Sequence, residues 1–218
     1  MSSPQQLKER LVEAARYAVL RRLAPALRHN MAGSLQPVSM MSAMLEKRLL
    51  KPELDMPLLV KNSAALNTLS REAALSCMDL MAWLVPKENE LFAFDACLQD
   101  ALALVNTELS FKGMTLVNET VGIDVPLPRS VVRNVVIAAV IVMTDTAVAP
   151  ANIVLTARHG DNQLLIAISM IANDGENMPG VMTTYRDLLW DDVQALAEAE
   201  SVSLTHTDVL VELRYHLA

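Results

Sequence analysis

Apolar residues recur at helical spacing along the first 84 positions, and this pattern constrains the fold more than any other feature of the chain. The first series, which includes one serine, comprises Leu7, Leu11, Ala14, Ala18, Met31, Leu35, Val38, Ser42, Leu45 and Leu49. Spacings of three and four place these residues on one helix face. Pro25 removes a backbone donor and crowds the preceding turn. The pattern predicts one long helix, or two helices joined at a kink near residues 20–25.

A second helix is expected to follow a turn at residues 51–55. Asp55 is a candidate N-cap, Pro57 suits the first turn, and Pro86 ends the helix. The apolar stripe comprises Leu66, Leu69, Ala73, Cys77, Leu80 and Leu84. Two antiparallel helices cannot bury this much apolar surface alone, whereas two copies can form a four-helix bundle. We therefore expect residues 1–86 to form a helical hairpin that dimerises with a second copy of the chain.

Strand and helix patterns alternate from residue 87 onward. In chain order they predict a strand at 91–94, a helix at 95–109 capped by Asp95, a strand at 114–118, a helix at 128–144, strands at 153–158 and 163–171, a helix at 190–200 and a strand at 209–215. Residues 87–218 should thus form an α/β sandwich. The whole chain is predicted to be an α+β protein.

Composition narrows the possible functions. The 218 residues carry a formal net charge of −7, which argues against a nucleic-acid partner because phosphate backbones are bound by clustered Lys and Arg. The longest apolar run, at 131–143, is interrupted by Arg133 and Asn134 and is too short to cross a bilayer. Two cysteines and no signal-peptide pattern give no sign of secretion. We expect a cytoplasmic protein without a membrane span.

One histidine stands out in the first helix, within Arg28-His29-Asn30-Met31-Ala32-Gly33-Ser34-Leu35-Gln36-Pro37. The heptad pattern groups Leu35, Ser42 and Leu49 in one seam position, and Met31, Val38 and Leu45 in the other. His29 then follows the preceding seam position, Arg28, and should lie on the accessible rim of the helix. An imidazole nitrogen is a nucleophile near neutral pH. His29 is therefore a candidate acceptor of a transferred group, although a lone histidine on a helix rim is more often merely solvated.

This segment resembles the H-box of two-component histidine kinases, in which a histidine carries a phosphoryl group. His29 followed by Leu35-Gln36 matches the branch that reads His-Arg-x-x-Asn-Asn-Leu-Gln, and Pro37 resembles the downstream proline of the commoner form. Asn30 replaces the usual acidic neighbour, and Gly33 stands where Asn or Thr is often found. The order of elements from residue 87 also resembles the ATP-binding domain of these kinases.

The resemblance places a degenerate ATP site in the second domain. Asn134 matches the first Asn of the kinase N-box, but Ala138 replaces the second, and a methyl group cannot bind a magnesium ion. Asp174 and Gly175 are remnants of the next box, in which Asn173 replaces the Asp that reads adenine. The residues from 180 to 190 lack the repeated glycines of a phosphate loop. We expect no ATP or other cofactor, no metal site and no autophosphorylation.

Three functions stay open. The first is a dimeric histidine phosphotransferase that exchanges a phosphoryl group between His29 and the receiver domain of a response regulator. The second is a non-catalytic adaptor that binds a receiver or a sensor, with His29 incidental. The third, an active sensor kinase, is disfavoured by Ala138 and by the missing glycines. His159, His206 and His216, expected in turns or near the end of the chain, have no metal-ligand spacing.

Overall fold

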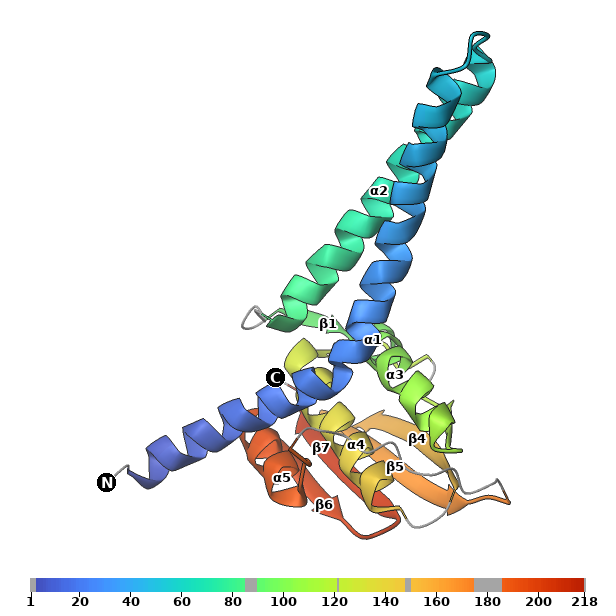
Figure 1. Ribbon diagram of the computed structural model, residues 1–218. Coiled ribbons are helices and arrows are strands. Elements are labelled where there is room, and N and C mark those ends of the chain that lie inside the picture. The colour runs from blue at the N-terminus through green and yellow to red at the C-terminus, as the bar shows by residue number, and fades with distance from the viewer. Residues whose placement is uncertain (1–2, 85–89, 121, 148–149, 175–185, 218) are drawn as a thin grey trace. The chain divides into compact units, whose positions relative to one another are not determined.

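The computed structural model describes residues 3–84, 90–120, 122–147, 150–174 and 186–217. The chain divides into two compact units, one formed by Ala24–Lys87 and the other by Met1–Leu23 together with Glu88–Ala218. The sequence suggested a division into 1–86 and 87–218. The first 23 residues instead cluster with the second part of the chain, and each unit is described by itself (Figure 1).

Helix α1 (Pro4–Leu49) is continuous and is shared by the two units. It contains Pro25 and Pro37, and the boundary between the units follows Leu23, two residues before the first proline. Of the two arrangements that the periodicity allowed, the structure has the single long helix. Each proline leaves one carbonyl of the preceding turn without its intrahelical donor, so the helix is locally weakened at both places.

The hairpin unit consists of the second part of α1 and helix α2 (Met56–Leu84). The Asp55 carboxylate accepts a hydrogen bond of 3.0 Å from the Leu58 amide, which confirms the predicted N-cap. The wholly or partly buried side chains of this part of α1 include Leu27, Met31, Ser34, Val38, Met41, Leu45 and Arg48, and those of α2 include Leu59, Asn62, Leu66, Leu69, Ala73, Ser76 and Leu80. Both series have heptad spacing, which is the pattern of an antiparallel helix pair.

The prediction for one of the two rows of the α1 seam is wrong. Met31, Val38 and Leu45 are partly buried as expected, whereas Leu35 and Leu49 of the second row are 46% and 54% exposed. The buried row instead contains Ser34 and Arg48. Because these residues are polar, the pattern placed the adjacent Leu35 and Leu49 in the seam. A hydroxyl pair stabilises this choice, because the Ser34 and Ser76 Oγ atoms lie 2.8 Å apart across the hairpin.

The first part of α1 departs from the periodicity in the same way. Leu7, Leu11 and Ala14 of the predicted stripe are exposed. The buried stripe lies one residue along and comprises Val12, Ala15, Val19 and Leu23. Both stripes have helical spacing, so only the surface against which the helix packs decides between them.

The α/β unit is built on a five-stranded sheet in the order β2-β4-β5-β7-β6. The strands are β2 (Thr115–Asn118), β4 (Ala151–Gly160), β5 (Gln163–Ala172), β6 (Val202–His206) and β7 (Leu210–His216). Strands β2 and β4 are parallel and the other neighbours are antiparallel. Two further strands, β1 (Leu91–Ala93) and β3 (Pro126–Pro128), form a separate antiparallel pair.

Helices cover one face of this sheet (Figure 1). They are α3 (Phe94–Phe111), a π-helical turn η1 (Val131–Val136) that continues into α4 (Ile137–Thr146), and α5 (Trp190–Ala199). Alternate strand residues such as Ile153, Leu155, Ile166 and Ile168 are fully buried, and so is most of α4. The core of the unit therefore lies between the sheet and its helical layer.

The predicted α+β fold class, a helical hairpin followed by an α/β sandwich, is confirmed. Strands β3 and β6 were missed, because segments of three and five residues give too few repeats to establish a period. Asp95 does not cap α3: the helix begins at Phe94, and the Asp95 carboxylate accepts a hydrogen bond from Gln99. None of the helices in the described ranges is both long and apolar enough for a membrane span.

Candidate functional site

His29 and both of its neighbours, Arg28 and Asn30, are exposed on α1 in the hairpin unit. The nearest seam residue is Leu27, not the predicted Arg28, so His29 lies further from the seam than expected and is open to solvent. Gly33, one turn further along, is also exposed, and a Cβ atom built there would meet no heavy atom within 4 Å apart from the adjoining residues and backbone of its own helix. A partner can therefore approach the imidazole without displacing a side chain of the hairpin seam.

A side-chain hydrogen bond across the seam connects this part of α1 with α2. The Ser34 hydroxyl donates a hydrogen bond of 3.0 Å to the carbonyl oxygen of Asn30 and contacts the Ser76 hydroxyl. The Ser34 hydroxyl thus connects the turn that carries His29 with Ser76 of α2.

Asn134, which the resemblance assigns to the N-box, lies in η1, and its side chain is hydrogen-bonded to protein groups. Its side-chain amide donates a hydrogen bond of 3.2 Å to a carboxylate oxygen of Glu200, just after α5. Ser130 donates to the other oxygen of that carboxylate, and Arg16 of α1 donates to the first at 2.9 Å. The Glu200 side chain is only 10% exposed. Asn134 therefore belongs to a structural network in this chain.

Ala138, at the position of the missing second Asn, is completely buried in α4. An asparagine there would have to place its amide among apolar side chains, at the cost of losing its hydrogen bonds to water. The core of the α/β unit thus disfavours restoration of the magnesium ligand.

The residues of the second box are only partly visible. The side-chain amide of Asn173, just after β5, donates a hydrogen bond of 3.0 Å to the side-chain Oδ1 atom of Asn152 in β4. Asp174 is exposed. Gly175 and the expected position of the phosphate loop up to residue 185 lie outside the described residues.

The other three histidines lie outside the hairpin unit. His159 was expected in a turn but belongs to β4, where its side chain is exposed, and His216 ends β7. His206 was expected in a turn but belongs to β6, where its ring stacks on Trp190 at a centroid distance of 4.0 Å. Burial raises the pKa of the Cys97 thiol to about 11, so it is not a thiolate at neutral pH. Over the part of the chain that is described, no three His, Cys, Asp or Glu residues gather as metal ligands would.

Comparisons with known proteins find likeness in structure only, since no family model and no curated protein matches the sequence. A histidine kinase from Burkholderia phymatum STM815 is similar at 18% identity and a TM-score of 0.48, over 90% of this chain and 98% of that one. The histidine kinase ThkA, solved in complex with the response regulator TrrA, is 15% identical with a TM-score of 0.44, over 98% of this chain and 66% of that one. A bacterial phosphotransferase is 12% identical with a TM-score of 0.39, over 98% and 97%.

The order of elements, a helical hairpin followed by an α/β sandwich of this kind, is the one that the H-box and N-box resemblances implied. The chain thus has the α+β architecture that the resemblance implied, a helical hairpin followed by an α/β sandwich. With TM-scores and identities this low, the solved structures carry no argument about activity, which has to come from the residues of this chain.

Sequence reasoning located His29 but missed the residues around Asn134. Glu200 accepts hydrogen bonds from Asn134, from Ser130 and from Arg16, and Arg16 lies 184 residues from Glu200 along the chain. No short motif connects them, so only the tertiary structure could have revealed this network.

Proposed function

We propose that this protein is a histidine phosphotransfer protein of two-component signalling, in which His29 exchanges a phosphoryl group with the receiver domain of a response regulator. The observation that carries the proposal is the exposed imidazole of His29 on a helical hairpin, in a segment similar to the H-box. The hairpin is proposed to pair with that of a second copy.

The chemistry requires little from the protein besides position. A neutral ring nitrogen of His29 attacks the phosphorus of an aspartyl phosphate on the receiver, an N–P bond forms, and the P–O bond to the aspartate breaks. The aspartate leaves as a carboxylate, and the reverse step returns the phosphoryl group. An in-line approach of the two groups supplies most of the rate advantage, because positioning and electrostatic stabilisation dominate phosphoryl transfer. The replacement of an acidic neighbour by Asn30 suits this role, because the receiver supplies its own acidic groups.

Kinase activity is not part of the proposal. Ala138 offers no oxygen ligand for magnesium, and the Asn134 amide is engaged with Glu200. Calorimetric titration with magnesium-ATP is expected to show no tight binding, and Ala138→Asn alone should not create it. A dissociation constant in the low micromolar range would contradict this expectation and favour an active kinase.

The test of the proposal is incubation with phosphorylated receiver domains, followed by detection of acid-labile, base-stable phosphate on this chain. His29→Ala and His29→Gln should abolish transfer while leaving dimerisation and receiver binding nearly unchanged, because an exposed side chain contributes little to packing. His159→Ala, which removes another exposed histidine, is the matched control and should transfer normally.

Two outcomes would contradict phosphotransfer. Undiminished labelling of both His29 variants would place the acceptor elsewhere. Binding of receivers without labelling of the wild-type chain would leave the non-catalytic adaptor as the surviving function.

A further inference from the structure

The first segment of α1, residues 4–23, is here called the strap. One face of the strap is inaccessible to solvent through Val12, Ala15, Val19 and Leu23, which are 0–8% exposed. The strap groups with Glu88–Ala218 in one compact unit, so these side chains are buried against the α/β unit. Its apolar contacts are made by small and β-branched side chains and one leucine, which bury little surface for a helix of this length.

Ion pairs flank the apolar face, and the two signs of charge come from different elements. The strap supplies only the cations of the ion pairs, and the α/β unit supplies the anions. The cation-bearing residues are Lys8, Arg16 and Arg22, and their partners are Glu198, Glu200, Glu108 and Asp145. Such complementarity between two surfaces makes their association sensitive to ionic strength.

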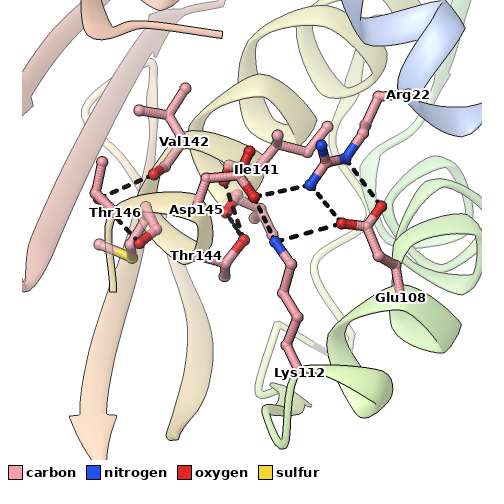
Figure 2. Close-up of polar contacts among 10 residues, drawn as sticks. Arg22, Glu108, Lys112, Ile141, Val142, Thr144, Asp145 and Thr146 are labelled. Carbon is pink, nitrogen blue, oxygen red and sulfur yellow. Dashed lines mark hydrogen bonds and ion pairs between the residues drawn. The ribbon is translucent and has the colours of Figure 1, made fainter. Parts of the chain in front are cut away.

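The strongest of these contacts is centred on Arg22, as Figure 2 shows. The guanidinium donates from Nε to one Glu108 oxygen at 2.9 Å and from Nη2 to the other at 2.5 Å, which is a bidentate pair with α3. Nη2 also donates to Asp145 of α4 at 2.8 Å, and Lys112 contacts both acids. The Arg22 side chain is only 10% exposed. Burial opposes its charge, but the bond to Glu108 and the two carboxylates outweigh burial and raise the pKa of Arg22.

The strap also closes the network around Asn134. Arg16 donates to the Glu200 carboxylate that accepts from Asn134 and from Ser130. Departure of the strap would leave the Glu200 carboxylate without its cation. The strap therefore covers the part of the helical layer that contains Asn134.

We propose that the strap is a releasable cover of the helical layer, latched by Arg22. When it is engaged, the start of the helix that carries His29 is fixed to α3 and α4. When its charges are screened or competed away, the strap opens without unfolding the sheet, exposes the helical layer and frees α1 from the α/β unit. This device goes beyond the proposed phosphotransfer, and it stands whether or not His29 is phosphorylated.

Hydrogen exchange of the full-length chain, read by mass spectrometry, tests the proposal. Arg22→Gln should speed amide exchange in the strap roughly tenfold, because opening then breaks two charge-assisted contacts fewer. Amides of β4, β5 and α2 should keep their protection. Arg10→Gln, which removes an exposed arginine of the same segment, is the matched control and should leave exchange unchanged.

The acids give a second, independent arm. Glu108→Gln combined with Asp145→Asn should accelerate the same amides, and adding Arg22→Gln to that pair should have little further effect, because all three residues form one cluster. In the wild-type chain, raising the salt from about 0.1 M to about 1 M shortens the screening length from about 10 Å to about 3 Å. Strap exchange should rise over this range ahead of exchange in the sheet.

Two results would overturn the proposal. If strap amides exchange only together with those of β4 and β5, the strap is an inseparable part of the core. If neither salt nor Arg22→Gln alters strap exchange, apolar contacts alone hold it and Arg22 is no latch. The salt series on the unmodified chain decides the question even if a variant fails to fold.

Discussion

Apolar side chains are buried to different extents in the two parts of helix α1. In the strap, four side chains form an almost fully buried stripe. In the hairpin part, Leu27 alone is classed as buried, while Leu35, Met40 and Leu49 are 46%, 65% and 54% exposed. One continuous helix thus contains a face that is already packed and a face that is only half packed.

The difference indicates which surface packs against each part of α1. The strap packs Val12, Ala15, Val19 and Leu23 against the rest of its own compact unit, although Leu7 and Tyr17 on its other faces stay exposed. The hairpin part contacts α2 along one narrow heptad seam, and α2 itself leaves Leu75, Met78 and Met81 more than half exposed. Exposed apolar side chains on both helices favour association with a further apolar surface. We expect a second hairpin to cover them and form a four-helix bundle.

The sharpest contrast should come from removing one leucine in each part. Leu23→Ala deletes a side chain that is 2% exposed and should lower the free energy of unfolding by about 2–4 kcal/mol. Leu49→Ala deletes one that is 54% exposed and should change the stability of the isolated chain by about 0.5 kcal/mol or less. Urea unfolding at low protein concentration measures both. Equal losses would contradict the distinction between a packed and a half-packed face.

Charge on the exposed row should separate assembly from folding. Leu35→Lys with Leu49→Lys is expected to weaken dimerisation roughly hundredfold while helicity is retained, because both side chains lie outside the seam of the single hairpin. Leu45→Lys, within the seam, should disrupt the hairpin itself and lead to aggregation. Sedimentation velocity and circular dichroism distinguish these effects. A wild-type chain that sediments as a stable monomer at micromolar concentration would refute the dimer.

A buried polar residue in the hairpin allows a smaller, stabilising test. Asn62 is buried in the α2 seam, and its side-chain amide nitrogen has no hydrogen-bond partner within the described ranges. Asn62→Leu should therefore raise the free energy of unfolding by about 1 kcal/mol, since the cost of the unpaired donor disappears. The loss of a polar seam position should also relax the pairing register. Asn67→Leu, at an exposed position of α2, should give no comparable gain in thermal stability.

The smallest effect is expected at the exposed end of the strap. Hydrogen bonds from Gln194 and then Lys8 lower the pKa of Glu198 below its ordinary value of 4.5. Because the pKa is lowered in the folded state, the ionised Glu198 carboxylate stabilises the fold above its ordinary pKa. This stabilisation is lost as the pH falls through the folded-state pKa. The raised pKa of Arg22 keeps that residue charged throughout this range. As the pH is lowered below 4.5, the midpoint temperature of thermal unfolding should fall slightly less steeply for Glu198→Gln than for wild type.

Much of the architecture could be predicted from local patterns. Helical spacing gave both hairpin helices, Asp55 gave the start of α2, and alternating apolar residues gave β4 and β5. The turn between these two strands places Asp161 and Asn162 at positive φ angles of 49° and 58°, a conformation that Asp and Asn tolerate well. The candidate phosphoacceptor was also found locally, because His29 lies within a short motif on a helix. Such signals survive because the residues that produce them are neighbours in the chain.

The sequence by itself determined the fold class, the hairpin, and the position of His29 on an accessible helix. It could not decide which of two adjacent stripes of α1 is buried, because Leu7-Leu11-Ala14 and Val12-Ala15-Val19 have the same periodicity and differ only in what they meet. Nor could it find the clusters around Arg22 and Glu200, whose members are up to 184 residues apart. Periodicity describes one element at a time, whereas burial and ion pairing are properties of two surfaces, and the second surface exists only once the chain has folded.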